Sequence, residues 1–327
     1  MPSNYKELLF LYTENARIKI RELAFKLQKS PQRLKYIMNK LETGQVLTNP
    51  HCIFDYSYFG QILFRVYFKG GYINEKDKVE TIRKLCENQY IVSIYELSGE
   101  YELVIEIESP NPSRFNKEIK KVREFIPTLD NYKVILNVFT RIYPRTYLLP
   151  ENSNLLSSSQ EIIIGGDRAI EKFNQEEMNI MKNLLENPKI RFTALAKKSN
   201  LNSKTALKIY KNLQKRKVIK GLKYTLDTNK LSINKFILFL KLHNVSPERD
   251  LKLLEYLSQT KEIIQINKTV GDWDVEIDIE SLDKAHIRYI LTQIREEFKD
   301  LIENFNIMEF YQVHKKSYLP QYLFNTE

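Results

Sequence analysis

A chain of 327 residues with 43% hydrophobic and 12% aromatic side chains is long enough for two or more globular domains. Its apolar runs are about strand length, well short of the roughly 20 residues of a membrane span, and the N-terminus lacks a signal-peptide pattern. Cys52 and Cys86 form no CxxC pair, which argues against a zinc site or a disulfide framework. We therefore expect a soluble cytoplasmic protein.

The positive charge is concentrated in two short segments. The net charge is +10, and the stretch 189–223 holds twelve Lys and Arg residues and no acid. Between residues 17 and 49 there are eight basic residues and two acidic ones. Clustered positive charge of this kind favours a polyanionic partner.

An internal repeat organises the chain. A shift of 172 positions aligns residues 15–69 with 187–241 without a gap, and the same shift superimposes GEYELVIEIES (99–109) on GDWDVEIDIES (271–281). Because two regions 30 residues apart share one register, we expect two copies of one unit. The Ser- and Gly-containing stretch between them reads as a linker.

Each unit is predicted to open with helices. In the first unit Leu8, Leu9 and Tyr12 give one apolar face, and residues 18–27 give a second helix. A third helix is predicted to begin at the cap Ser30, and Gly44 to end it in a left-handed conformation. In the second unit Asn202 is the equivalent cap. Short helices joined by a tight turn indicate a helix-turn-helix.

The rest of each unit shows strand and helix periods in the order β-α-β-β-α-β, which is that of a ferredoxin-like domain. Alternation in the hairpin places Leu103, Ile105 and Ile107 on one face, and Glu102, Val104, Glu106 and Glu108 on the other. The predicted segments are 62–69, 76–88, 91–97, 101–108, 113–125 and 133–143, then 236–243, 247–259, 263–269, 273–280, 284–298 and 306–313.

The predicted fold class is therefore α+β, with two tandem units, each a winged helix-turn-helix followed by a ferredoxin-like βαββαβ domain. The predicted divisions are a first helix-turn-helix (1–50), a first effector and dimerisation domain (51–150), a linker (151–172), a second helix-turn-helix (173–223) and a second effector and dimerisation domain (224–327).

This ordered set resembles the Lrp/AsnC, or feast/famine, regulators. The resemblance rests on RIKIRELAFKLQKSPQRLKYIMNKLETGQVL, on KIRFTALAKKSNLNSKTALKIYKNLQKRKVI and on the hairpins SGEYELVIEIE and VGDWDVEIDIE. It implies a winged helix-turn-helix and a ferredoxin-like domain that dimerises and often binds an amino acid. Two positions depart from the pattern: Arg216 replaces the glycine found at Gly44, and Glu102 stands where Asp274 keeps the usual acid.

The resemblance implies two sets of site residues. In a helix-turn-helix the second helix enters the major groove while flanking cations contact phosphates. The candidate DNA-binding residues are Gln32, Arg33, Tyr36, Lys40, Arg191, Lys204, Thr205, Lys208, Lys211 and Lys215. The candidate effector-binding residues are Gly99, Glu100, Tyr101, Glu102, Gly271, Asp272, Trp273 and Asp274.

No catalytic constellation stands out in the sequence. The four histidines, His51, His243, His286 and His314, are scattered, and there is no GxGxxG, P-loop or nucleophile elbow. We therefore expect no enzyme, no cofactor and no metal. The expected protein is a sequence-specific regulator that binds double-stranded DNA, responds to an amino acid or another small effector, and forms homo-oligomers through its ferredoxin-like domains.

Two alternatives remain. Siroheme decarboxylases of haem biosynthesis resemble the same family, but their HNYxR-type stretch is missing before the hairpins, where this chain has VSIYELSGEYE and IQINKTVGDWD. The other alternative is a ligand-sensing or structural protein that has lost DNA binding, which the basic segments disfavour.

Overall fold

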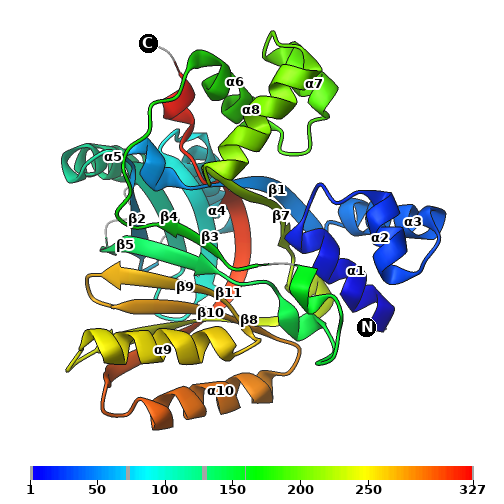
Figure 1. Cartoon of the computed structure of the whole chain (residues 1–327). Coiled ribbons are helices and arrows are strands. Elements are labelled where there is room, and N and C mark those ends of the chain that lie inside the picture. Colours follow the sequence, from blue (N-terminus) through cyan, green and yellow to red (C-terminus); the bar gives the residue numbers. More distant parts are fainter. Residues whose placement is uncertain (1–2, 71–73, 127–130, 159, 326–327) are drawn as a thin grey trace.

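The computed structural model describes residues 3–70, 74–126, 131–158 and 160–325 (Figure 1). Its helices are α1 (Ser3–Glu14), α2 (Ile20–Leu27), α3 (Pro31–Thr43), α4 (Glu75–Glu87), α5 (Pro112–Phe125), α6 (Gln175–Glu186), α7 (Phe192–Lys198), α8 (Ser203–Lys215), α9 (Pro247–Gln259) and α10 (Lys284–Glu297). Its strands are β1 (Leu47–Phe54), β2 (Ile62–Phe68), β3 (Ile91–Ser98), β4 (Leu103–Ser109), β5 (Tyr132–Ile142), β6 (Ile162–Gly165), β7 (Ile219–Leu226), β8 (Asn234–Leu242), β9 (Ile263–Val270), β10 (Val275–Ser281) and β11 (Ile302–Lys316). Among these residues no helix is long and apolar enough to cross a membrane.

The centre of the molecule is a closed antiparallel barrel. The strand order is β2-β4-β3-β11-β8-β10-β9-β5, and β5 pairs back onto β2, with β6 added along β5. Two of these neighbours join the two halves of the chain: β11 lies between β3 and β8, and β5 lies between β2 and β9. The strands predicted for two units therefore form one continuous sheet.

Helices cover the outside of the barrel on two sides. Phe64 and Ile105 face outward with Phe115 of α5, in a core that also contains Leu85 of α4. On the other side, α9 and α10 cover β8, β9 and β10, as the lower part of Figure 1 shows. Helices cover the outer face of these strands, and the inner face is enclosed by the barrel. Side chains on both faces are therefore buried.

A two-stranded ribbon lies across one end of the barrel. β1 pairs with β7, and a third core joins this ribbon to α1–α3 and α6–α8. The connection crosses between the halves of the chain: α1 packs on β7, and the Ala16 amide donates to the Leu222 carbonyl at 2.9 Å. In Figure 1 the ribbon separates the two helical groups.

The predicted order of helices and strands is confirmed, as is a mixed α/β fold with a large antiparallel sheet. The cap at Ser30 is also confirmed, since its side chain accepts from the Arg33 amide. The prediction for Gly44 is wrong: its φ is −74°, and the left-handed residue is Gln45, at φ 53°. The stretch 151–172, expected to be a linker, contains β6.

Candidate functional site

A basic cavity lies at the end of the barrel, beneath the β1–β7 ribbon. Its volume is about 80 Å³. It is lined by His51, Arg65, Tyr95, Ile142, Tyr143, Arg145, Lys223, Tyr224, Thr225, Lys235, Ile237, Ile264, Gln265, Asp278, Phe310, Val313, Lys316 and Tyr318. These residues include five lysines and arginines and one acid, Asp278, so cationic side chains outnumber acidic ones in the wall of this basic cavity.

Arg65 lies at the bottom of the basic cavity. Its side chain is 2% exposed and is held between two glutamates: Nη1 donates to Glu276, and Nε lies 3.4 Å from Glu106. Burial alone would lower the pKa of Arg65, but the two carboxylates raise it well above its ordinary value. Arg65 is therefore a fixed positive charge.

A second ion-pair network forms the side of the basic cavity nearest α1. Arg145 Nε donates to Glu280 at 2.8 Å, and its Nη1 lies 3.6 Å from Glu14. Lys223 of β7 also pairs with Glu14, and Tyr147 donates to Glu280 at 2.9 Å. Burial alone would raise the pKa of Glu280, but Arg145 and Lys235 hold it below its ordinary value.

His51 is the histidine of this basic cavity. Its Nδ1 lies 2.9 Å from the Asn49 carbonyl, and its ring lies beside that of Tyr318, tilted by 34° with the centroids 5.5 Å apart. Burial, which the hydrogen bond with Asn49 opposes and the charges of Lys316 and Lys223 reinforce, lowers the pKa of His51 to about 3. At neutral pH the ring is uncharged, so Nδ1 carries the proton donated to Asn49 and Nε2 is an acceptor.

Several polar atoms of the wall have no hydrogen-bond partner within the described residues. They are Arg65 Nε, Tyr143 Oη, Thr225 Oγ1 and Asp278 Oδ1. Buried polar groups are normally satisfied, and an unsatisfied cluster around one cavity is typical of a ligand site. Their donors suit a carboxylate.

A wide polar groove adjoins the basic cavity. It has a volume of about 660 Å³ and shares Thr225, Phe310 and Val313 with the basic cavity. Its other residues come from β1 and the turn before it, from the end of β7 and the segment after it, and from β11; they include Gln45, Asn49 and Lys230. The groove falls in the size range of small-molecule sites, about 300–1,000 Å³, whereas the basic cavity alone does not.

The predicted effector residues lie elsewhere, in the two hairpins. Gly99 and Gly271 have φ of 141° and 147°, as hairpin glycines do. Tyr101 packs against Tyr67, and Trp273 against Phe239, in an aromatic cluster inside the barrel. Three of the four acids form ion pairs: Glu100 with Lys69, Asp272 with Lys133 and Asp274 with Lys241. None of the eight predicted effector residues lines the basic cavity.

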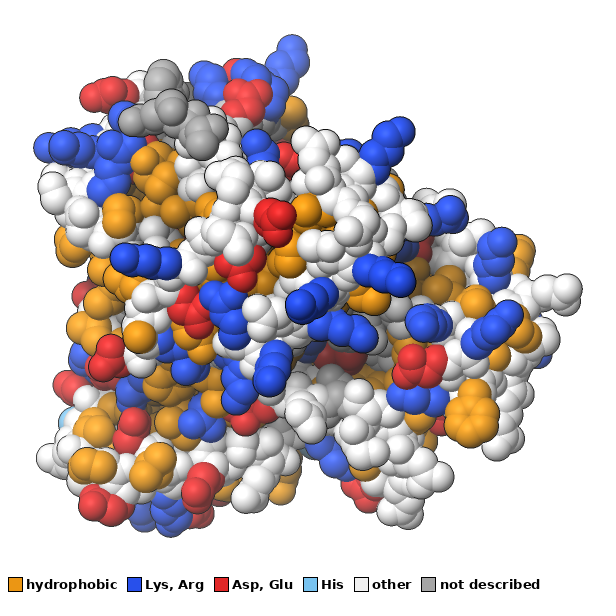
Figure 2. Space-filling view, turned by 45° about the horizontal axis from the view of Figure 1, so that its top comes forward, with side chains coloured by type: hydrophobic (Ala, Val, Ile, Leu, Met, Phe, Trp, Pro, Cys, Tyr) orange, Lys and Arg blue, Asp and Glu red, His pale blue; other side chains and the backbone are white. Residues whose placement is uncertain are grey.

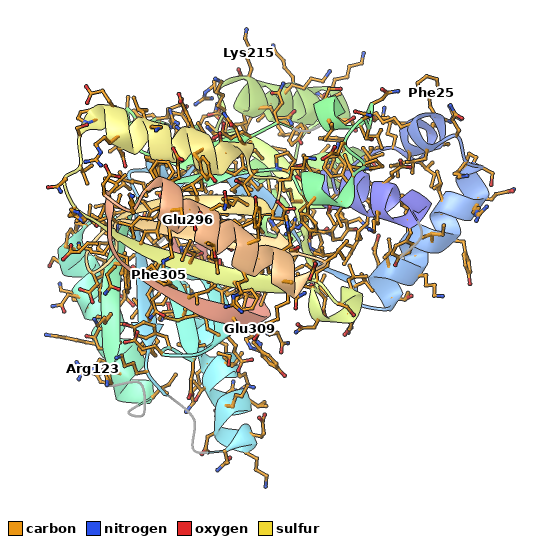
Figure 3. The ribbon with its side chains drawn as sticks, turned by 90° about the horizontal axis from the view of Figure 1, so that it is seen from below. Phe25, Arg123, Lys215, Glu296, Phe305 and Glu309 are labelled. Atoms are coloured by element: carbon orange, nitrogen blue, oxygen red, sulfur yellow. The ribbon has the colours of Figure 1, made fainter. Side chains whose placement is uncertain are left out.

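The predicted DNA-binding residues lie on α3, on α8 and just before α7. All are exposed except Thr205, which is half-buried. In Figure 3, Lys215 lies at the outer surface, away from the barrel. Figure 2 shows Lys and Arg side chains spread over one face with acids between them.

The acid-free segment is partly neutralised by acids far away in the sequence. Lys189 pairs with Glu42, Arg216 with Glu171 and Glu177, Lys220 with Asp55, and Lys223 with Glu14. Four of its twelve cations therefore bind other parts of the chain. The segment is less available to a polyanion than its composition suggests.

The chain was compared with known families and structures. No family model and no curated protein matches it. Among solved structures it is similar to the siroheme decarboxylase NirDL, with a TM-score of 0.58 and 13% identity over 98% of this chain and 97% of that one. NirDL with an iron-uroporphyrin III analogue gives a TM-score of 0.57 and 14% identity, over 97% and 94%. An AsnC family transcriptional regulator from Agrobacterium tumefaciens gives 0.38 and 18%, over 43% of this chain and 92% of that one.

These comparisons correct the functional prediction. The whole chain is similar in fold to the siroheme decarboxylase NirDL, and this finding overturns the predictions of an Lrp/AsnC regulator, of a double-stranded DNA partner and of no enzyme activity. A tandem duplication of the regulator unit is likewise not supported. In the described part of the chain, no group of three or more His, Cys, Asp or Glu side chains is arranged to hold a metal ion.

Sequence reasoning missed the basic cavity because its residues come from distant strands. His51, Arg145, Lys223 and Lys316 share no motif, and only the closure of the barrel brings them together. One signal was present: alternation placed Glu106 and Glu108 opposite Ile105 and Ile107, and these acids indeed face the barrel interior.

Proposed function

We propose that this protein is an enzyme that binds an anionic tetrapyrrole and removes carbon dioxide from one of its carboxylate arms. The observation that carries the proposal is the basic cavity, buried at the end of a barrel whose whole-chain fold is shared with siroheme decarboxylase. The donors of the basic cavity suit a carboxylate, and its size suits one arm of a larger molecule.

The substrate occupies both the polar groove and the basic cavity. A tetrapyrrole ring is too large for a cavity of about 80 Å³, but an acidic side arm fits there. The groove of about 660 Å³ is large enough for a ring, and Thr225, Phe310 and Val313 line both the groove and the basic cavity. The ring therefore lies in the groove while one arm passes Phe310 into the basic cavity.

The residues of the basic cavity have two roles toward this arm. Lys235 and Arg65 attract the carboxylate, with Lys235 reaching the wall from β8 beside Asp278 at 3.3 Å. Ile142, Ile237 and Ile264 supply apolar wall next to these charges. A carboxylate is better solvated by water than by an apolar wall, and carbon dioxide is neutral, so this surface favours loss of the charge.

The chain lacks the HNYxR-type stretch, but the basic cavity still contains a histidine and arginines. His51 reaches it from β1 and Arg145 from the end of β5, both far from the hairpins. We propose that His51 Nε2 and Arg145 contact the arm from the ribbon side.

Binding and turnover test this proposal separately. Siroheme and iron-uroporphyrin III are titrated into the protein while the Soret absorbance is followed, and carbon dioxide release is then measured. Lys235→Met should weaken binding by roughly 10- to 100-fold, since one charged hydrogen bond contributes roughly 1.5–3 kcal/mol. The control is Lys252→Met on α9, whose side chain is 69% exposed outside the barrel.

Absence of any Soret change with either compound would rule out the tetrapyrrole. Binding that responds equally to the Lys235 and Lys252 changes would place the ligand outside the basic cavity.

A further inference from the structure

Glu108, near the end of β4, is a buried acid that the proposed function does not yet use. Its side chain points into the barrel and is 1% exposed, and its Oε2 has no hydrogen-bond partner among the described residues. Tyr56, Leu63, Val92 and Ile164 surround it. A carboxyl group in such surroundings is stable mainly in its uncharged form.

Glu106, two residues earlier on the same face, has the opposite environment. Tyr95 donates to it at 2.8 Å, Arg65 Nε lies 3.4 Å away and Lys316 Nζ 3.5 Å away. Burial alone would raise the pKa of Glu106, but Lys316 and Arg65 lower it to about 2. Burial raises the pKa of Glu108 well above its ordinary value, and the charge on Glu106 raises it further. Two neighbouring carboxyls held in opposite states are typical of acid–base sites.

Comparison with Glu280 shows why Glu108 forms no ion pair within the described residues. Glu280 lies in the corresponding place at the end of β10, but it accepts from Arg145 and Tyr147. The chain near Glu108 offers Lys316 and Tyr318 instead, and Lys316 is turned toward Glu106 and the Tyr95 hydroxyl, 2.5 Å away. Glu108 therefore keeps its proton while Glu280 loses it.

A small space beside Glu108 adjoins the basic cavity and shares wall residues with it. It measures about 10 Å³ and is lined by Glu106, Glu108, Gln265, Lys316 and Tyr318, of which the last three also line the basic cavity. About 10–15 Å³ is the room that one water molecule needs, and a proton can cross one intervening water.

We propose that Glu108 is the proton source for the decarboxylation, delivering its proton through one water beside Lys316 to the carbon that loses carbon dioxide. This inference rests on the proposed function. The bond between that carbon and the carboxylate breaks, its electron pair stays on the carbon, and carbon dioxide leaves. The carbon then takes the proton from Glu108, whose carboxylate is stabilised by Lys316 and regains a proton from solvent.

The test is Glu108→Gln, which keeps the size and the neutral state of the side chain but has no acidic proton. We expect kcat for carbon dioxide release to fall by roughly 10²–10⁴-fold, with the Soret titration unchanged. In the wild type kcat should fall as the pH rises through the raised pKa of Glu108, because the acid form is the active one. This alkaline limb should be absent from the residual activity of the variant.

Two controls separate a chemical role from a structural one. Glu255→Gln, on the exposed side of α9, should leave kcat and the pH profile unchanged. Glu108→Gln should be at least as stable as the wild type at pH 8, since burial of an ionisable carboxyl disfavours folding above its unfolded pKa and an amide avoids this.

Wild-type binding and turnover combined with an unchanged kcat and pH profile in Glu108→Gln would overturn the role of Glu108 alone. Wild-type protein that neither binds nor decarboxylates the tetrapyrrole would overturn the proposed function itself.

Discussion

The lowered pKa of His51 should make the stability of the folded protein depend on pH. Its folded pKa is about 3, while an unfolded histidine titrates near 6.5. As the pH falls below about 6.5 the unfolded chain gains a proton that the folded chain refuses, so stability is lost between about pH 6.5 and pH 3. His51→Asn, whose amide can still donate to Asn49, removes this loss. From pH 7 to pH 4.5, urea unfolding should show the wild type losing about 2 kcal/mol more than the variant.

A matched histidine outside the barrel provides the control for this experiment. His286 lies on α10, and its side chain is 43% exposed. His286→Asn should not reduce the acid sensitivity in this way. Equal acid sensitivity of the wild type and His51→Asn would show that the basic cavity is wet enough to protonate His51.

Arg65 provides the second prediction at this scale. Arg65→Met leaves Glu106 and Glu276 buried without their shared cation, which should lower the free energy of unfolding by about 3–5 kcal/mol. Adding Glu276→Gln removes one stranded carboxylate, so the double variant should regain part of the loss. Chemical unfolding at pH 7 measures both. Strictly additive losses would mean that the two residues do not interact.

At the scale of the element, the chain after α8 places a lysine in a backbone conformation that normally favours glycine. Lys217, which follows the C-cap Arg216, has φ 63°, a left-handed conformation that costs an L-residue about 1 kcal/mol or more. Lys217→Gly should therefore raise the free energy of unfolding by about 0.5–1 kcal/mol in thermal or urea unfolding. Lys211→Gly, at an exposed position inside α8, is the matched control and should lower it by about 1 kcal/mol. A loss of stability in both variants would contradict the left-handed assignment.

The elements themselves were predictable because their signals are local. Asn202 caps α8 by accepting from the Thr205 amide, and alternation sorted β4 into an outer and an inner face. The Gly44 prediction failed because glycine is only a preference at the left-handed position. In this chain both helices place the next residue there, Gln45 or Lys217.

At the scale of the whole molecule, sequence reasoning failed where partners are far apart in the chain. No local sequence pattern predicts that β11 lies between β3 and β8, or that β5 pairs with both β2 and β9. The basic segment 189–223 misled for the same reason, because the acids that neutralise Lys189 and Lys223 are Glu42 and Glu14. The basic cavity exists only when these pairings are made, so no local pattern in the sequence predicted it.

Closure of the barrel predicts that the two halves of the chain unfold together. Leu103 of β4 is fully buried between the barrel and α4–α5, so Leu103→Ala should cost about 2–5 kcal/mol. The sole tryptophan, Trp273, lies in the other half of the chain and packs in the interior cluster with Phe239. Because β3–β11 and β5–β9 pairing ties the halves together, Trp273 fluorescence and far-UV circular dichroism should shift to the same lower denaturant midpoint. Val79→Ala, at a 66% exposed position on α4, should shift neither curve. A biphasic dichroism curve with an unmoved Trp273 transition would show instead that the halves unfold independently.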